Sequence, residues 1–434
     1  MDQNDDDLLR VLIIAPSLDG NDVGEVYSAF QGIKALTRKA DVTVLSSSRE
    51  GAVPLAEQLP QAKVITWPEL PLLYRKFERF NAQAKPGLIL FHRQVRNWVR
   101  NALASGTRFD IVHQYLPQAM RHGFALRGMG LPYVIGPLGG GLETPPKFKD
   151  EVGPESLATR LRAIDGFRLR HDPWLKASYQ QADLILGVAP YVGDRLKTLG
   201  IKRFHAMLER GHGALPPENI RQANIGQLNL LHVGRTVRTK GLRDVVRAMA
   251  HLRDLPDVTL TSAGDGPDLA ACRAEAHQLG VADRIAFLGR IPREAVEDEY
   301  TRADVFCFPS YREPMGGVFF EAMAHGLPVL TAARGGPDFI IDDDSGIRLA
   351  VETPEQFATD IADAIRSLAL DPARRLALGA GARTRLKSFG NWEDKASSMI
   401  ALYREVLNSR VRSMSPRITS GAASSRPARP ALTK

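Results

Sequence analysis

The sequence is poor in cysteine and contains no long apolar run. Its two cysteines, Cys272 and Cys307, lie far apart in apolar or helical surroundings, which favours packing over a disulfide or a metal site. The apolar stretch 11–15 is too short for a signal-peptide core, and no stretch approaches the length needed to span a membrane. We also find no internal repeat. These absences indicate a globular protein of a reducing, cytoplasmic compartment.

Length and apolar content predict more than one domain. The 434 residues are 44% hydrophobic, which is enough for two or three domains with sizeable cores. Short apolar runs alternate with helical segments in the first half, and this alternation implies a parallel α/β sheet. The strands expected there cover residues 10–15, 41–46, 110–113, 133–135 and 184–187, with a helix over 24–39. We place the first domain at 1–205, a linker at 206–228 and the second domain at 229–390.

The most informative segment begins with the apolar run Val305–Phe308. This run has the pattern of a buried parallel strand that ends in a turn at Pro309. Glu313 then lies at the carboxyl end of a strand, which is where open α/β sheets bind ligands. Glycines let backbone amides approach a ligand closely, and the residues that follow are Met315, Gly316, Gly317 and Val318. A helix over 319–326 then places Glu321 about one turn inside its start.

Two interpretations fit these glutamates. Carboxylates accept paired hydroxyl hydrogens, so Glu321 suits a ribose and Glu313 a transferred sugar. Alternatively, Glu321 is an ordinary helix carboxylate and Glu313 a solvated loop acid. Two cations upstream favour the first interpretation. Arg235 and Lys240 follow an expected strand over 230–233, and together a forked guanidinium and a compact ammonium suit a diphosphate.

These stretches together resemble the retaining glycosyltransferases of family 4, also called glycosyl transferases group 1. The matching pieces occur in the family's order over nearly all of residues 228–350. They are Val233–Gly241, Gly264–Pro267, Phe287–Gly289, Ala303–Asp304 and Pro309–Val329. The resemblance implies the GT-B fold, which has two facing Rossmann-like domains with parallel sheets and a cleft between them. It also implies that a helix over 391–409 crosses back onto the first domain.

The resemblance assigns roles to individual residues. Arg235 and Lys240 would bind the donor diphosphate, Glu313 the hexose hydroxyls and Glu321 the ribose. The backbone of 315–318 would cradle sugar and phosphate. Arg290 lies where such enzymes hold the base through main-chain contacts. Gly24 lies on the first loop, where a family backbone amide meets the donor phosphate, although the glycines here are spaced unusually and a plain tight turn also explains Gly24.

The chain departs from the family after the strand at 133–135. Many members carry a histidine there, whereas this chain has a glycine loop, Gly136–Gly141, with Glu143 just beyond it. The segment resembles a subgroup in which such a loop replaces the histidine. Glu143 is a candidate acceptor-side base or hydroxyl ligand, because a carboxylate near the reacting hydroxyl can take its proton. His113 is the alternative base. The simpler explanations are a solvated loop acid for Glu143 and a hydrogen-bonded core-edge histidine for His113.

The family's reaction implies retention at the anomeric carbon. It is described as a same-face substitution in which the departing diphosphate helps to deprotonate the acceptor, with Arg235 and Lys240 stabilising the leaving phosphate. Nothing in the first domain marks a nucleophile of the kind that a retaining glycosidase uses. No Asp-x-Asp motif occurs in a setting that suits metal-assisted binding. We therefore expect no metal and no cofactor besides the nucleotide-sugar donor.

The formal charge of +8 is unevenly distributed. Between Tyr74 and Arg108 a single acid, Glu78, accompanies eight basic residues interleaved with apolar ones. Such a segment suits an anionic membrane surface and, in an acceptor-binding domain, a lipid-linked acceptor. The alternative is a long helix that buries its apolar stripe and solvates its arginines. No nucleic-acid recognition motif accompanies the charge. Residues 410–434 contain no acid and many Ser, Ala and Pro, which predicts a disordered basic tail.

The sequence therefore predicts a hexosyltransferase that uses UDP- or GDP-hexose and a glycan or lipid-linked acceptor in bacterial polysaccharide or glycolipid assembly. We expect it in the cytoplasm or at the inner face of the cytoplasmic membrane. Two alternatives remain open: a nucleotide-sugar epimerase or phosphorylase on the same fold, and a non-catalytic nucleotide-sugar-binding partner. The hexose, the choice between UDP and GDP, the acceptor and the oligomeric state are not determined by these patterns.

Overall fold

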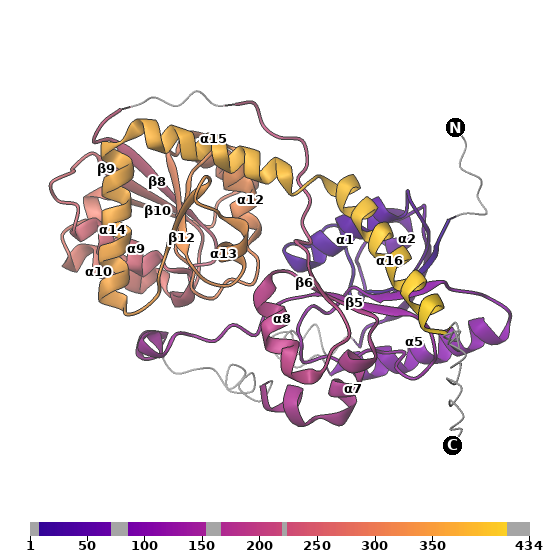
Figure 1. The fold of residues 1–434 in the computed structure, drawn as a ribbon. Coiled ribbons are helices and arrows are strands. Elements are labelled where there is room, and N and C mark those ends of the chain that lie inside the picture. The colour runs from indigo at the N-terminus through magenta and orange to yellow at the C-terminus, as the bar shows by residue number, and fades with distance from the viewer. Residues whose placement is uncertain (1–7, 71–85, 153–165, 219–223, 415–434) are drawn as a thin grey trace, which may run out of the picture.

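Two open parallel sheets form the framework of the chain (Figure 1). The computed structural model describes residues 8–70, 86–152, 166–218 and 224–414. Within these residues a seven-stranded sheet has the order β3-β2-β1-β4-β5-β6-β7, and a six-stranded sheet has the order β10-β9-β8-β11-β12-β13. The recorded pairings between neighbouring strands of both sheets are parallel. The prediction of two α/β domains is confirmed.

The strands are short and mostly buried. Those of the first sheet are β1 (Arg10–Ile14), β2 (Asp41–Ser48), β3 (Lys63–Pro68), β4 (Ile111–Gln114), β5 (Tyr133–Leu138), β6 (Leu184–Gly187) and β7 (Phe204–Ala206). Those of the second sheet are β8 (Leu228–Val233), β9 (Val258–Ala263), β10 (Ile285–Gly289), β11 (Val305–Phe308), β12 (Val329–Ala332) and β13 (Gly346–Leu349). Strands buried on both faces need apolar side chains throughout, which is why β11 is the continuous run Val-Phe-Cys-Phe.

Helices cover both faces of each sheet. In the first domain they are α1 (Glu25–Leu36), α2 (Leu55–Gln58), α5 (Gly87–Ala104), α7 (Pro173–Gln181) and α8 (Pro190–Leu196). In the second they are α9 (Leu242–Ala250), α10 (Leu269–Gln278), α11 (Arg293–Arg302), α12 (Gly317–Ala324), α13 (Gly336–Ile340), α14 (Pro354–Leu370) and α15 (Pro372–Ser388). The chain then returns to the first domain as α16 (Trp392–Met414).

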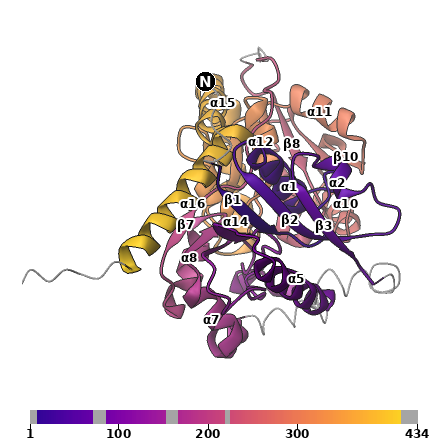
Figure 2. The same cartoon turned by 90° about the vertical axis from the view of Figure 1, so that its right-hand side faces the viewer.

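Alternation along β1 shows how the two faces are divided. Val11 and Ile13 pack with α1 and α16, whereas Leu12 and Ile14 pack with α5 and α7 on the opposite face, as the period of two in a strand requires. Figures 1 and 2 show these helix pairs on the two sides of the first sheet. The core that contains Leu12 continues into the second domain and includes residues of α12, α13 and α15. The two domains are therefore packed on one another.

Domain boundaries follow from the strands and from α16. The first sheet ends at Ala206 and the second begins at Leu228, so the linker covers 207–227 and differs from the expected 206–228 by one residue at each end. α16 continues to Met414, beyond the expected end at residue 409. Arg410 forms an ion pair with Asp183 (2.8 Å), so it is part of the folded protein and not of a tail. Residues 415–434 of the expected tail lie outside the described residues.

The basic segment predicted to contact a membrane is described from residue 86 onward; Arg75, Lys76, Arg79 and Lys85 lie outside the described residues. α5 buries Phe91, Val95 and Val99 against the first sheet, so much of its apolar stripe serves packing, as the alternative interpretation requires. Ile89 remains 77% exposed and Leu90 49%. Among the helices of the described residues, none is both long and apolar enough to cross a membrane.

Candidate functional site

The strongest predicted residues meet where the strand order of the second sheet reverses. β8 and β11 are neighbours there, and their outgoing loops diverge to opposite sides and leave a crevice. Lys240, on the loop after β8, forms an ion pair with Glu313, on the loop after β11. Both side chains are largely buried, with exposures of 19% and 12%. Lys240 and Glu313, 73 residues apart in sequence, are thus paired where the strand order reverses, which is where open parallel sheets bind ligands.

Glycine is required at the start of α12. Gly316 adopts φ 90°, and a Cβ on it would lie 2.6 Å from the ring of Phe319 and 2.9 Å from Cγ of Glu313. A Cβ on Gly317 would lie 2.1 Å from the guanidinium of Arg210. Met315 is buried and Val318 half-buried. The loop therefore brings bare backbone amides to a helix N-terminus, which is a favourable place for an anion.

Glu321 is held by groups that the sequence patterns did not single out. Arg210, on the linker, donates from Nη2 to Oε1 of Glu321 (2.9 Å), and the hydroxyl of Tyr300 donates to Oε2 (3.2 Å). Glu321 remains 29% exposed. A linker arginine has no strand or helix pattern of its own, so only the fold could reveal its place. Glu321 is thus oriented from two sides and still accessible.

Arg235 and Arg290 occupy different places on the second sheet. Arg235 is exposed on the loop after β8, and no ion pair of its side chain with another described residue is recorded. Arg290 is also exposed, but it follows β10, the edge strand, two strands away from β8. Arg235 and Lys240 thus lie on the same loop after β8, whereas Arg290 lies toward the edge of the same sheet.

The loop after β8 contains another cation, Arg238, which sequence reasoning missed. Its side chain is 3% exposed and bonds both carboxylate oxygens of Asp244 (2.6 and 2.7 Å), as well as Glu151 from the first domain. The guanidinium also lies over the rings of Phe148 and Tyr311, at 5.8 and 5.7 Å. Arg238 therefore stabilises the loop itself rather than reaching a ligand. No local pattern distinguishes it from Arg235.

The glycine loop of the first domain contacts the loop that carries Glu313. A Cβ on Gly139 would lie 3.6 Å from Cβ of Pro314, and a Cβ on Gly335 would lie 2.6 Å both from the carbonyl oxygen of Glu313 and from Leu142. Gly136 adopts φ 121° with the carbonyl of Leu186 only 2.3 Å from a Cβ position, so a larger residue is excluded. The two sides of the candidate site therefore meet at this loop.

Glu143 lies at the end of the glycine loop and is accessible. Its side chain is 76% exposed and accepts from Nη2 of Arg195 (3.0 Å), while its backbone carbonyl accepts from Arg334 of the second domain (2.9 Å). Gly24 caps α1 with φ 65° and is exposed on the loop after β1. The structure thus places Glu143 at the domain contact and Gly24 on the first-domain loop nearest the reversal of strand order, between β1 and β4.

The geometry of His113 favours the structural explanation over a role as base. Its side chain is fully buried, and both ring nitrogens are engaged: Nε2 with the carbonyl oxygen of Gly136 and Nδ1 with the hydroxyl of Tyr403, each at 2.6 Å. Because a carbonyl can only accept, Nε2 carries the proton and Nδ1 accepts from Tyr403. Burial lowers the pKa of His113 to about 4. We therefore assign it to the attachment of α16.

Two buried polar groups near this contact were also missed. The hydroxyl of Tyr191, on α8, is buried; burial raises its pKa, the nearby charge of Glu313 acts in the same direction, and a hydrogen bond from the backbone of Gly140 acts against both. The carboxyl of Glu209, on the linker beside Arg210, is 4% exposed and accepts from the amide of Gln118. Both groups have a hydrogen-bond partner within the fold, as buried polar groups generally do.

Glu209 predicts a pH-dependent stability. Burial first, and then the nearby charge of Glu25, raise its pKa from 4.5 to about 8, against the opposing effects of Gln118 and Arg210. A raised pKa means that the folded state holds the proton more tightly, so this stabilisation is complete below pH 4.5 and is lost as the pH rises through about 8. One pKa unit corresponds to about 1.4 kcal/mol, so several kcal/mol are at stake.

The variant Glu209→Gln keeps the hydrogen bond to Gln118 but cannot ionise. We expect the wild-type melting temperature to fall relative to that of the variant as the pH is raised from about 5 to about 9. Thermal unfolding of both proteins over this range measures the difference. If the difference in melting temperature between the two proteins is the same at every pH, the pKa of Glu209 is not raised in the folded protein.

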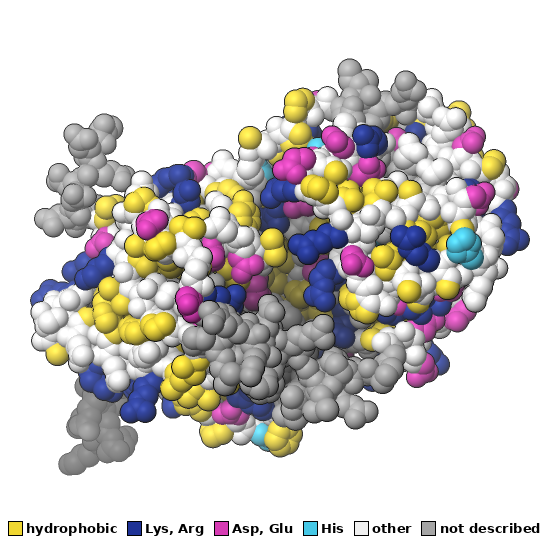
Figure 3. All heavy atoms as spheres, turned by 180° about the vertical axis from the view of Figure 1, so that it is seen from behind, with side chains coloured by type: hydrophobic (Ala, Val, Ile, Leu, Met, Phe, Trp, Pro, Cys, Tyr) yellow, Lys and Arg dark blue, Asp and Glu magenta, His cyan; other side chains and the backbone are white. Residues whose placement is uncertain are grey.

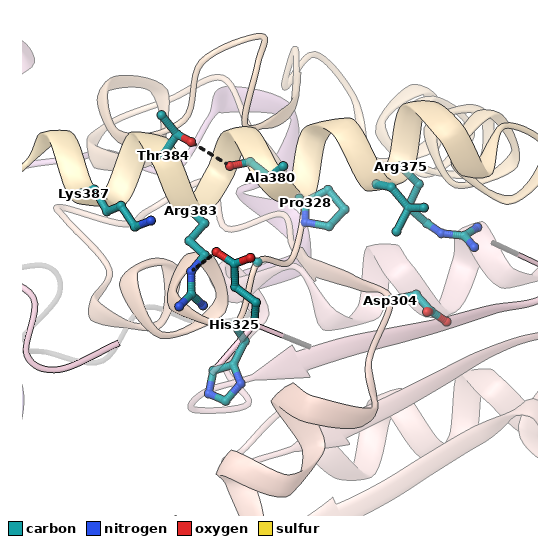
Figure 4. Close-up of a pocket in the computed structure, with 12 residues that line it drawn as sticks. Asp304, His325, Pro328, Arg375, Ala380, Arg383, Thr384 and Lys387 are labelled. Atoms are coloured by element: carbon teal, nitrogen blue, oxygen red, sulfur yellow. Dashed lines mark hydrogen bonds and ion pairs between the residues drawn. The ribbon is translucent and has the colours of Figure 1, made fainter. Parts of the chain in front are cut away.

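A separate cavity lies away from these loops. It has a volume of about 250 Å³ and is lined by residues of α15 and of the loop between α12 and β12, with His325, Arg383 and Lys387 among them (Figure 4). None of the predicted site residues lines it. Arg383 there forms an ion pair with Glu218 (3.4 Å) and donates to two backbone carbonyls, so this cation is already engaged.

The hollow between the two lobes has a basic border. Figure 3 shows Lys and Arg side chains along the second-domain side of this hollow. Within the described part of the chain, no group of three or more His, Cys, Asp or Glu side chains converges as metal ligands would.

The fold and the site together define a GT-B protein, with two Rossmann-like domains and a candidate ligand site at the switch point of the second. Residues 218–385 match a family model described as glycosyl transferases group 1. A D-inositol 3-phosphate glycosyltransferase of Xylanimonas cellulosilytica is 34% identical over 184 residues, which cover 42% of this chain and 43% of that protein. The chain spans about half the length of the curated relatives it matches.

Solved structures are similar over most of the chain. Sucrose-phosphate synthase from Thermosynechococcus elongatus aligns with a TM-score of 0.64 and 22% identity over 92% of this chain and 100% of that one. Anabaena Alr3699/HepE in complex with UDP aligns with a TM-score of 0.60 and 15% identity over 92% of this chain and 100% of that one. At such identities the similarity establishes the fold, and the prediction of GT-B architecture is confirmed.

Proposed function

We propose that this chain is a retaining, metal-independent hexosyltransferase that takes its sugar from UDP- or GDP-hexose. The observation that carries the proposal is the partly buried pair of Lys240 and Glu313 at the switch point, with Arg235 exposed on the same loop as the lysine. A cation for phosphate and a carboxylate for hydroxyls lie side by side there, as a nucleotide-diphosphate sugar requires. The match to glycosyl transferases group 1 and the similarity to a glycosyltransferase support the same class.

Each group has a distinct part in the proposed reaction. Arg235 and Lys240 bind the diphosphate and stabilise the charge that develops on it as the bond to the anomeric carbon breaks. Glu313 binds hexose hydroxyls, the amides of 315–318 hold sugar and phosphate, and Glu321 binds the ribose. The acceptor hydroxyl attacks from the face that the diphosphate leaves, and its proton passes to the departing phosphate oxygen. The configuration at the anomeric carbon is retained.

Fewer residues are proposed to bind the acceptor than the donor. Glu143 is exposed beside the glycine loop and is suited to bind or deprotonate an acceptor hydroxyl. Tyr191 offers a second hydroxyl near Glu313. Gly24 and Arg290 remain proposed contacts to donor phosphate and base. His113 drops out of this scheme because neither ring nitrogen is available.

The acceptor is a glycan or a lipid-linked sugar of bacterial polysaccharide or glycolipid assembly. On α5, Ile89 is exposed on the same helix face as Arg93 and Arg100, which are also exposed. An apolar side chain among arginines suits a peripheral contact with an anionic membrane. We therefore place the enzyme in the cytoplasm, at the inner face of the cytoplasmic membrane during catalysis.

The test is release of UDP or GDP from a panel of UDP- and GDP-hexoses by the purified chain, with and without bacterial lipid extract. We expect turnover of one donor that rises when lipid is added. Binding of a donor without turnover under any acceptor would favour the non-catalytic alternative, and interconversion of two donor sugars would favour an epimerase. If no donor binds, the site assignment is wrong.

A further inference from the structure

A short segment of the first domain is built into the second domain. The 3-10 helices η2 (Pro146–Phe148) and η3 (Asp150–Val152) follow the glycine loop and reach the second domain, where Figure 1 shows them in purple below it. We name residues 146–152 the strap. Phe148 is fully buried in the core of the second domain, with ring centroids 4.7 Å from Tyr311 and 6.0 Å from Phe357. The strap is thus anchored in the donor-binding half of the molecule.

Glu151 connects the strap to residues 234–241, the loop after β8 that we name the donor loop after its proposed ligand. Its carboxylate accepts from Nε (2.8 Å) and Nη2 of Arg238 and from Nη1 of Arg247 (2.8 Å). Burial alone would raise the pKa of Glu151, but the charges and hydrogen bonds of the two arginines hold it below its usual range. Asp244 bonds the same guanidinium of Arg238 from the second domain. Arg238 is therefore held between one carboxylate from each domain.

The backbone of the donor loop is fixed around Arg238. The carbonyl of Arg238 accepts from the hydroxyl of Tyr311 (3.1 Å), and the carbonyl of Thr239 accepts from the hydroxyl of Ser310 (3.1 Å) and the amide of Tyr311 (3.2 Å). Arg235 and Lys240 flank this fixed stretch at three and two residues from Arg238. Loss of one of the two carboxylates would leave a buried guanidinium partly uncompensated, and the loop that carries it would have to adjust.

We propose that Glu151 is a positioning residue for the diphosphate site. The strap holds Arg238, and Arg238 in turn sets the conformation of the loop from which Arg235 and Lys240 reach the donor. This inference rests on the proposed nucleotide-sugar donor. It adds that a carboxylate of the acceptor-binding domain contributes to donor affinity without touching the donor, and that the glycine loop and the donor loop are joined by one short length of chain.

The chain offers a matched control for Glu151. Glu275, on α10, also bonds Arg247 (2.5 Å) and is 23% exposed, as Glu151 is, but no bond from Glu275 to Arg238 is recorded among the described residues. Glu151→Gln and Glu275→Gln therefore each remove one carboxylate from Arg247, and only the first alters Arg238. Both variants keep the volume of the side chain, but each replaces one acceptor oxygen with an NH2 group that can only donate. Glu275 also lies 3.8 Å from Arg243, which keeps its ion pair with Asp268 in the control variant, so differences between the two variants report chiefly on Arg238.

The first measurement is amide hydrogen exchange in the full-length, ligand-free chain. Peptides that span 235–241 should exchange at least about threefold faster in Glu151→Gln than in Glu275→Gln, because the buried arginine has lost one partner. The second measurement is binding of UDP and GDP by calorimetry. The dissociation constant of the nucleotide that binds should rise by about five- to twentyfold in Glu151→Gln and by less than twofold in Glu275→Gln.

The outcomes separate this inference from the proposed function. Equal exchange over 235–241 in the two variants would overturn the role of Glu151, whatever the nucleotide affinity. Faster exchange with unchanged nucleotide affinity would also overturn the role of Glu151, since the conformation of the loop would then not affect donor affinity. If the wild type binds neither UDP nor GDP, the proposed function fails, and the exchange data still decide whether Glu151 holds the loop.

Discussion

Replacing Lys240 with alanine should lower the turnover of the donor sugar by about 10²–10³-fold, which is the usual effect of removing one preorganised group from a developing oxyanion. Lys240 is 19% exposed and paired with Glu313, so its ammonium lies in a partly dehydrated site where charge is worth more than in water. The lysine is proposed to bind the leaving diphosphate in the transition state. The loss should therefore appear in kcat as well as in kcat/KM. Steady-state release of UDP or GDP measures both.

Lys197→Ala is the control for charge alone. Lys197 is 70% exposed in an ion pair with Asp194, on the outside of the first domain, and its replacement should leave turnover within about twofold of the wild type. A Lys240→Ala variant that raises KM while kcat stays unchanged would show that the lysine contributes only uniform binding. In that case its proposed role on the leaving group is wrong.

Glu313→Gln should reduce turnover by about 10²-fold or more, although the variant keeps the size of the side chain. The glutamine cannot accept two hydroxyl hydrogens as a carboxylate does, and it leaves Lys240 without its partner in a site where Glu313 is only 12% exposed. The double variant with Lys240→Ala should lose far less than the product of the two single effects, because the pair acts as a unit. Turnover of the four proteins gives this comparison.

Glu299→Gln is the matched control for burial. Glu299 is 16% exposed and paired with Arg302 on α11, outside the candidate site, so turnover should change by less than about twofold. If Glu313→Gln turns over the donor at the wild-type rate, the carboxylate of Glu313 has no part in the reaction. Additive losses in the double variant would mean that Lys240 and Glu313 act on different parts of the substrate.

Several features of the site could be predicted from local patterns. β11 was expected at 305–308 and lies there, because a continuous apolar run has few alternatives in a doubly covered sheet. The loops after β8 and β11 were expected to carry Arg235, Lys240 and Glu313, and the strand order makes those two loops neighbours. Parallel strands place all their carboxyl ends at one edge of the sheet, so residues just after strands can be assigned to that edge without knowing the packing.

Other features depended on long-range packing. His113 has the appearance of a base at a strand end, but α16 returns from the far end of the chain and places Tyr403 on its Nδ1. α5 is basic and amphipathic, yet its apolar stripe packs on the first sheet. Neither contact can be predicted from local sequence, because the contacting residues are distant in the chain; Tyr403 is 290 residues from His113.

The sequence by itself determined the α/β class, seven of the thirteen strands in the described residues and the residues that follow β8 and β11. Periodicity, glycines and charges act over a few residues, so these properties are readable locally. Only the tertiary structure decided that Arg210 orients Glu321, that Glu209 is buried and that the strap places Glu151 on Arg238. Burial and charge pairing are set by which segments meet in space, and for these residues the meeting segments belong to different domains or to the linker between them.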